Sequence, residues 1–196
     1  LLLAGRAGSR VFAGAAAFCP ISDLARWHAD STLRHDGYSR MMEAACGGTP
    51  KEKPTEYAAR SPLTCLKSDP FLPVMIATGI HDGHRGSVPV GHAIRAYNAL
   101  AAECDRISER DIAFIEENER VPEALAFKGS DPFYPKNRRI HLRRTSGNVQ
   151  LTLFEGGHED NFLAGLDFLS RQRSWTPADW TLPVSARRTG ISSVAK

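Results

Sequence analysis

Residues 72–83 read Leu72-Pro73-Val74-Met75-Ile76-Ala77-Thr78-Gly79-Ile80-His81-Asp82-Gly83, a short apolar run that ends in a polar loop. A second apolar run, Val149–Phe154, ends in the loop Glu155-Gly156-Gly157-His158-Glu159. Short apolar runs bounded by turn residues are typical of strands buried in a parallel sheet. Because ligands sit at the carboxyl ends of such strands, we expect Asp82 and His158 to lie together at one edge of the sheet.

Strand-like and helix-like patterns alternate along the chain. Strands are expected at 11–18, stopped by Pro20, and at 72–79 and 149–154. Helices are expected at 38–45, 88–104, 108–120 and 162–173, where apolar residues recur at three- and four-residue steps. The strand at 11–18 is predicted to be buried on both faces. This alternation predicts an α/β fold in which a parallel sheet is flanked by helices.

The length of 196 residues suits one domain, with a hydrophobic content of 42% that allows a sizeable core. We assign residues 1–173 to this domain, with insertions near 28–64 and 105–148. Residues 174–196 are expected to form a partly disordered tail, above all at 185–196. The basic run at 136–144 is expected to be an amphipathic strand with Ile140 and Leu142 inward and its arginines solvated.

Composition restricts the partners of the chain. The net charge of +3 is too balanced to indicate nucleic acid or a membrane surface as a partner. No apolar run approaches the length of about 18–20 residues that a membrane span needs. The four cysteines are widely spaced and form no zinc-binding pattern, so we expect free, buried thiols and no cofactor.

An aspartate after one strand and a histidine after a later strand correspond to the second half of a Ser–Asp–His order. Histidine suits a general base near neutral pH, and a carboxylate on its other ring nitrogen fixes the tautomer. We therefore expect the Asp82 carboxylate within hydrogen-bonding reach of the His158 ring. The third member, a serine in Gly-x-Ser-x-Gly, does not occur in the sequence, and neither Ser9 nor Ser87 is expected to replace it.

The layout resembles the C-terminal part of an α/β-hydrolase, in the prolyl oligopeptidase-like and acyl-esterase branch. Four stretches carry the resemblance, and their order is more specific than any one of them: 11–24, 59–63, 72–89 and 154–159. By this resemblance, Asp82 and His158 are the triad acid and base. The nucleophile and half of the oxyanion hole would lie upstream of Leu1, so the upstream part of the same catalytic domain would be required.

The sequence departs from this family in two places. Five residues, 83–87, separate Asp82 from Val88-Pro89, where the family usually has about two. The stretch 105–148 is also longer than a minimal crossover from helix to strand, which suggests an insertion that shapes the pocket.

The resemblance implies a serine hydrolase, either a peptidase or a carboxylic-ester hydrolase, that acts on a small ester or peptide through an acyl-enzyme. One alternative is a metal-dependent hydrolase with His81, Asp82, His84 and His158 as ligands, since imidazole and carboxylate suit zinc. Another is a non-catalytic binding domain of the same fold. His84, Arg85 and His92 are candidates for the pocket rim, although solvated or capping roles are favoured for them.

Overall fold

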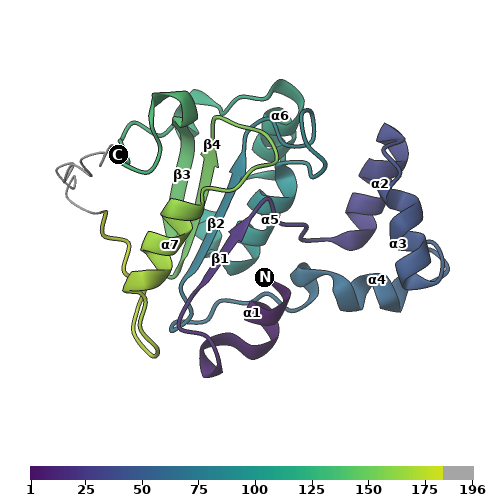
Figure 1. Cartoon of the computed structure of the whole chain (residues 1–196), viewed down its shortest axis with the longest axis horizontal. Coiled ribbons are helices and arrows are strands. Elements are labelled where there is room, and N and C mark those ends of the chain that lie inside the picture. Colours follow the sequence, from purple (N-terminus) through teal and green to yellow (C-terminus); the bar gives the residue numbers. More distant parts are fainter. Residues whose placement is uncertain (183–196) are drawn as a thin grey trace, which may run out of the picture.

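The computed structural model describes residues 1–182, which form one mixed sheet flanked by helices (Figure 1). The strand order is β1-β2-β4-β3, and β1, β2 and β4 run parallel to one another. The α/β class is thereby confirmed. The strands are β1 (Ala15–Phe18), β2 (Val74–Gly79), β3 (Ile140–Ser146) and β4 (Val149–Phe154).

The sheet is not wholly parallel, which corrects the expectation from the alternating pattern. β3 pairs with β4 in the antiparallel direction. Only Gly147 and Asn148 separate these strands, and Gly147 has a φ of 53°. So short a connection can join only antiparallel neighbours, because a parallel pair needs a long crossover. The Gly-Asn dipeptide is the sequence signal for this hairpin.

The described part of the chain contains seven α-helices. They are α1 (Leu2–Ala7), α2 (Leu24–Arg34), α3 (Tyr38–Cys46), α4 (Pro54–Arg60), α5 (Gly91–Leu100), α6 (Glu109–Asn118) and α7 (Phe162–Arg171). Helices α5 and α6 cover one face of the sheet and α7 covers the other (Figure 1). Helices α2–α4, which lie between β1 and β2 in the sequence, form a separate lobe beside the sheet.

The main core lies between the sheet and α5–α6. Along β2, Val74 and Ile76 belong to this core, whereas Ala77 packs on the opposite side with α7. Ile94 of α5 and Ile112 of α6 are fully buried against the sheet. Burial of β2 on both faces explains why its sequence is apolar throughout.

Local signals predicted several helix ends correctly. The Ser108 side chain accepts a hydrogen bond from the Asp111 backbone N–H and caps α6. Helix α3 ends at Gly47, whose φ of 78° suits a residue without a side chain. Helix α5 is shorter than expected and ends at Leu100, so Cys104 is exposed on a following turn.

The prediction of free, buried thiols holds in part. All four cysteines are free, and Cys19 and Cys46 are buried, but Cys65 is only partly buried and Cys104 is exposed. The amphipathic strand expected over the basic run 136–144 forms only from Ile140 onward, as β3, with Leu142 fully buried, whereas Lys136–Arg138 form a 3₁₀ turn. The arginines of β3 are not all solvated, because Arg143 pairs with the buried Asp131 at 2.7 Å.

The first strand differs most from its expected form. Pairing begins only at Ala15, and Val11 is 68% exposed. β1 lies at the edge of the sheet and its residues are half-buried, so the expectation of burial on both faces is wrong. A run of small and apolar residues does not by itself say whether the strand it forms is buried on both faces.

The segment after α7 lies against the fold as far as it is described. Trp180 stacks on Phe168 at 5.1 Å, and its indole N–H donates to the Gly147 carbonyl. The tail expected at 185–196 lies outside the described residues. Within residues 1–182, none of the helices is long and apolar enough to span a bilayer.

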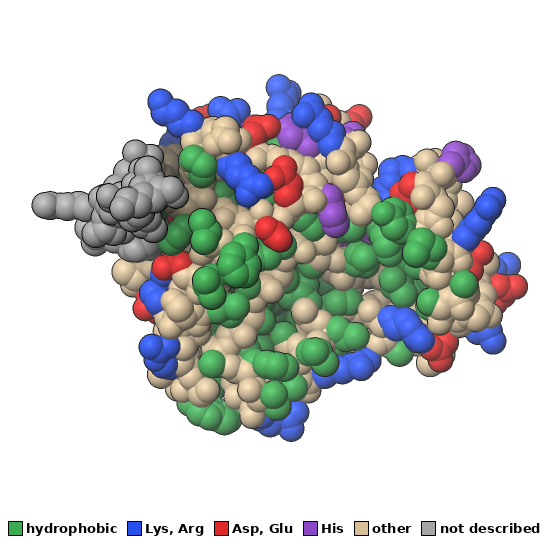
Figure 2. Space-filling view, in the orientation of Figure 1, with side chains coloured by type: hydrophobic (Ala, Val, Ile, Leu, Met, Phe, Trp, Pro, Cys, Tyr) green, Lys and Arg blue, Asp and Glu red, His purple; other side chains and the backbone are tan. Residues whose placement is uncertain are grey.

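Helix α7 packs on the sheet through its small residues and turns large ones outward. Ala164 and Gly165 face β1 and β2, whereas Phe162 is 66% and Leu163 63% exposed. Figure 2 shows hydrophobic side chains gathered on this face and around α1. An open strand edge beside exposed apolar side chains favours association between molecules.

We therefore expect the chain to self-associate with rising concentration. Leu166→Glu, within the exposed face of α7, should weaken this association by about tenfold or more, because a charge is costly to bury. Leu33→Glu is the matched control, since Leu33 is 80% exposed on α2, away from this face. Sedimentation velocity measures the effect, and a wild-type chain that stays monomeric at all concentrations would contradict it.

Candidate functional site

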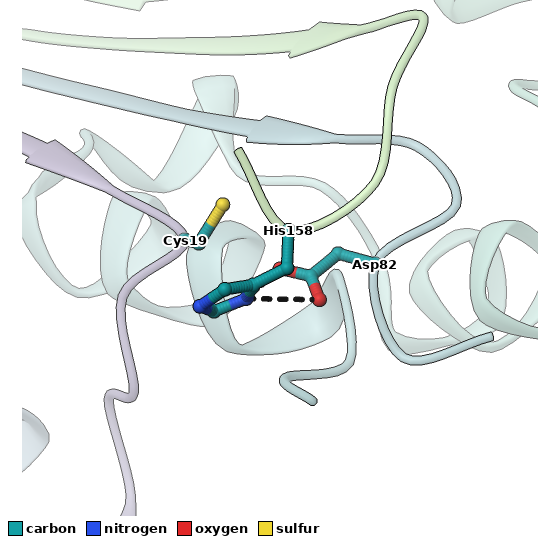
Figure 3. A group of neighbouring side chains, drawn as sticks. All are labelled: Cys19, Asp82 and His158. Atoms are coloured by element: carbon teal, nitrogen blue, oxygen red, sulfur yellow. Dashed lines mark hydrogen bonds and ion pairs between the residues drawn. The ribbon is translucent and has the colours of Figure 1, made fainter. Parts of the chain in front are cut away.

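The site lies where two neighbouring parallel strands end. β2 pairs with β4 up to Gly79 and Phe154, so the loops that follow leave the sheet side by side. His158 Nδ1 lies 2.9 Å from Asp82 Oδ2 and 3.1 Å from Oδ1 (Figure 3). The structure thus brings together the two side chains that the sequence singled out, across 76 positions of chain.

The Asp82 carboxylate accepts hydrogen bonds from three different residues. It is 1% exposed, and besides His158 it accepts hydrogen bonds from the Val88 backbone N–H at 3.1 Å and the Thr78 hydroxyl at 3.3 Å. A buried carboxylate without such donors would be strongly destabilising. The lengthened loop 83–87 still returns the chain so that Val88 contacts the carboxylate.

Two glycines allow the loops to approach this closely. A Cβ atom at Gly79 would overlap the carbonyl groups of Gly156 and Gly157. A Cβ atom at Gly86 would overlap Asp82 Oδ1 and crowd His158 Cβ. Glycine is therefore required at both positions, at Gly79 by the backbone of the neighbouring loop and at Gly86 by the side chains of Asp82 and His158.

His158 is oriented by Asp82 and open to solvent. Its side chain is 43% exposed, in contrast to its partner. Because a carboxylate only accepts hydrogen bonds, Nδ1 carries a proton, and Nε2 of the neutral ring is then an acceptor. Among residues 1–182, all hydrogen bonds of the ring go to Asp82. The pair can accept a proton at Nε2 from a group that approaches from outside.

Cys19 is a neighbour that the sequence argument did not select. It directly follows β1, and one donor atom from each of Cys19, Asp82 and His158 lies within 4.8 Å of the others (Figure 3). The same strand-end rule could have identified it. Burial raises the pKa of its thiol to about 11, so the sulfur is protonated near neutral pH and is a poor nucleophile.

The four residues of the alternative metal set do not converge. His81 Nδ1 lies 2.6 Å from Glu119, and its Nε2 lies 2.8 Å from Glu155. His84 is on the outer side of the loop, with Nε2 at 2.6 Å from the Glu116 carbonyl oxygen. Asp82 and His158 are the two members of that set that contact each other, so the alternative four-ligand metal site is not formed.

His81 instead links the two loops of the site. Its two ring nitrogens face the carboxylates of Glu119 and Glu155, which come from the end of α6 and from the loop after β4. The hydrogen bond from His81 lowers the pKa of the Glu155 carboxyl, and His141, with Nε2 at 2.9 Å, lowers it further. The hydrogen bond from His81 is also the main cause of the lowered pKa of Glu119.

A second Ser–His–Asp arrangement lies beneath the site. His92 Nδ1 lies 3.3 Å from Ser22 Oγ, and Nε2 lies 3.3 Å from Asp30 Oδ2. Ser22 and His92 are both fully buried, so His92 does not line a pocket rim and no substrate can reach this serine. The arrangement ties α2 and the segment after β1 to α5.

An open cleft of about 520 Å³ lies beside His158. Its lining is rich in charged side chains, among them His81, Arg85, Arg138, Glu155 and Glu159. Such a lining suits a polar substrate. Comparisons with family models, with curated proteins and with solved structures gave no match.

We predict that Asp82 fixes the tautomer of His158. The Nδ1 proton should give a slowly exchanging, low-field imidazole signal in ¹H NMR, and Asp82→Asn should abolish it, because the amide cannot hold that proton in the same way. Asp30→Asn, which alters the buried His92 arrangement instead, is the control. A His158 signal that is unchanged in Asp82→Asn would contradict this role.

Glu155 should stabilise the fold in a pH-dependent way. A carboxyl with a lowered folded-state pKa contributes stability above its unfolded pKa of about 4.3, and this is lost as the pH falls through the folded-state value. Glu155→Gln should therefore lower the free energy of unfolding near pH 6 by on the order of 1 kcal/mol. This difference should shrink as the pH falls below about 4.3.

Urea unfolding of the wild-type chain and of Glu155→Gln at a series of pH values measures this difference in the free energy of unfolding. Glu117→Gln is the control, since Glu117 is exposed on α6. An equal effect of the two substitutions, or an effect of Glu155→Gln that is constant with pH, would contradict the prediction.

Proposed function

We propose that the chain supplies the acid and base of an α/β-hydrolase-type serine hydrolase, which acts on a small ester or peptide through an acyl-enzyme. The proposal depends on one observation. The buried Asp82 carboxylate orients the exposed His158 ring at the carboxyl ends of adjacent parallel strands. A positioned imidazole backed by a carboxylate is the arrangement that activates a serine hydroxyl.

In this mechanism His158 Nε2 takes the proton from the serine hydroxyl as its oxygen attacks the substrate carbonyl. The imidazolium then donates that proton to the leaving group, and the second half-reaction repeats the sequence with water. Asp82 keeps the proton on Nδ1 and stabilises the imidazolium. No serine hydroxyl within residues 1–182 is hydrogen-bonded to the ring. In the Ser–Asp–His order the nucleophile comes before the acid, and the proposal assigns it to a segment upstream of Leu1.

The cleft beside His158 is the proposed substrate site. Glu155 and Glu159 are engaged with His81 and Arg138. Arg85 lines the same cleft and is exposed. A polar acyl or leaving group suits these surroundings better than a long alkyl chain. Peptide and ester substrates both fit this description.

A fluorophosphonate probe tests the proposal, because it reacts with a serine whose proton is withdrawn by a base. The 196-residue chain should remain unlabelled, the buried Ser22 included. The protein extended with its natural upstream sequence should be labelled on one serine before Leu1. In that protein, His158→Ala should slow ester hydrolysis by about 10⁴-fold or more, because triad members act as a unit.

His84→Ala is the matched control, since His84 lies in the adjacent loop and faces α6. It should leave the hydrolysis rate within about threefold of wild type, in the range of small surface effects. Labelling of any serine within residues 1–182 would overturn the assignment. An extended protein that stays unlabelled would favour the non-catalytic binding domain.

A further inference from the structure

Three different donor atoms meet at the ends of three neighbouring strands. Cys19 follows β1, Asp82 follows β2 and His158 follows β4, and one ligand atom of each lies within 4.8 Å of the others (Figure 3). A thiol, a carboxylate and an imidazole are the ligand types that Zn²⁺ binds in proteins. Sites with three protein ligands leave a fourth position for water or another small ligand.

We propose that Cys19, Asp82 and His158 bind Zn²⁺ or a similar thiophilic divalent cation, in place of the hydrogen bond between Asp82 and His158. Tetrahedral coordination at about 2.0–2.3 Å sets the ligand atoms roughly 3.2–3.8 Å apart. The oxygen–nitrogen contact of 2.9 Å would have to open by a few tenths of an ångström. The sulfur, already within 4.8 Å, would have to move inward by about 1 Å or a little more.

The hydrogen bonds around the three side chains also favour a metal site. Asp82 keeps two hydrogen bonds, from Val88 and Thr78, that do not involve His158. Outer donors of this kind orient a carboxylate ligand. Thr78 also lies 3.5 Å from the Cys19 sulfur, so one hydroxyl contacts two of the three ligands.

The backbone of Cys19 is unusual in the same place. Its φ of 45° lies in the left-handed region, which is rare for a residue with a side chain and often marks a functional site. The sulfur contacts the Glu159 carbonyl oxygen at 3.3 Å, which places it beside the loop that carries His158. Solvent reaches the group through the half-exposed imidazole.

Binding would exchange protons for the cation. Bonds form from the metal to sulfur, to Nδ1 of the ring and to a carboxylate oxygen. The S–H bond breaks and its proton passes to solvent, while the proton on Nδ1 is replaced by one on Nε2, so that the ring stays neutral. The bound metal would occupy both members of the acid–base pair, so Zn²⁺ would inhibit the hydrolase proposed above. The metal site itself does not depend on that proposal.

Metal titration of the 196-residue chain tests the inference. Equilibrium dialysis with Zn²⁺ should give one tightly bound ion per chain, and Co²⁺ should give a sulfur-to-metal charge-transfer band in the near ultraviolet. Cys19→Ser should abolish the band and weaken Zn²⁺ binding by about 100-fold, at or above the effect of losing an outer-shell partner. His158→Ala should weaken binding to a similar degree and, at an exposed position, should leave the fold intact.

Cys46→Ser and His84→Ala are the matched controls, a buried cysteine and a loop histidine outside the group, and neither should change the affinity. Binding that is unchanged in both Cys19→Ser and His158→Ala would overturn the inference. It would place the cation elsewhere, for example at Glu119 and Glu155, the two carboxylates that face His81. No binding up to about 1 mM, an affinity of only about 4 kcal/mol, would also overturn it. Neither result would alter the fluorophosphonate outcome, so the two proposals fail separately.

Discussion

The carboxylate of Asp82 sets the constraint on which the arrangement of this sheet edge depends. A charged group that is 1% exposed must find donors for both oxygens, and here they come from β2, from the start of the segment that leads to α5 and from the loop after β4. Each donor fixes one loop relative to another. Loss of any one of them leaves a buried acceptor partly unsatisfied, which is destabilising well beyond the small net value of an average hydrogen bond.

A chain of polar contacts lies near the Asp82 carboxylate, closer to the surface of the molecule. His81 joins Glu119 at the end of α6 to Glu155 at the end of β4. The same carboxylate of Glu155 reaches His141 on β3. These contacts are more exposed than Asp82 and individually weaker, but together they connect α6 and β3 to the segments that follow β2 and β4.

The sequence predicted the strand ends and the meeting of Asp82 with His158, because apolar runs and the geometry of parallel sheets determine both. It did not predict that β1 begins only at Ala15 or that α7 turns an apolar face outward, since residue type alone does not say which neighbour a surface packs against. The contacts of His81 with Glu119 and Glu155 were not predicted either. Charged side chains reach partners through loop conformations, and those have no periodicity in sequence.

Helix α2 of the lobe holds the loop after Asp82 through hydrogen bonds to one backbone carbonyl. The Trp27 indole and the Arg34 guanidinium both donate to the carbonyl oxygen of Ser87, each at 2.7 Å, in the loop that surrounds Asp82. Such a contact does not depend on the side chain of residue 87, so this position can change while the path of the loop is kept. Helix α2 can in turn adjust the site through residues that never touch it. Substitutions at residue 87 would then be tolerated as long as Gly86 and the two α2 donors are kept, with the position of the carboxylate preserved.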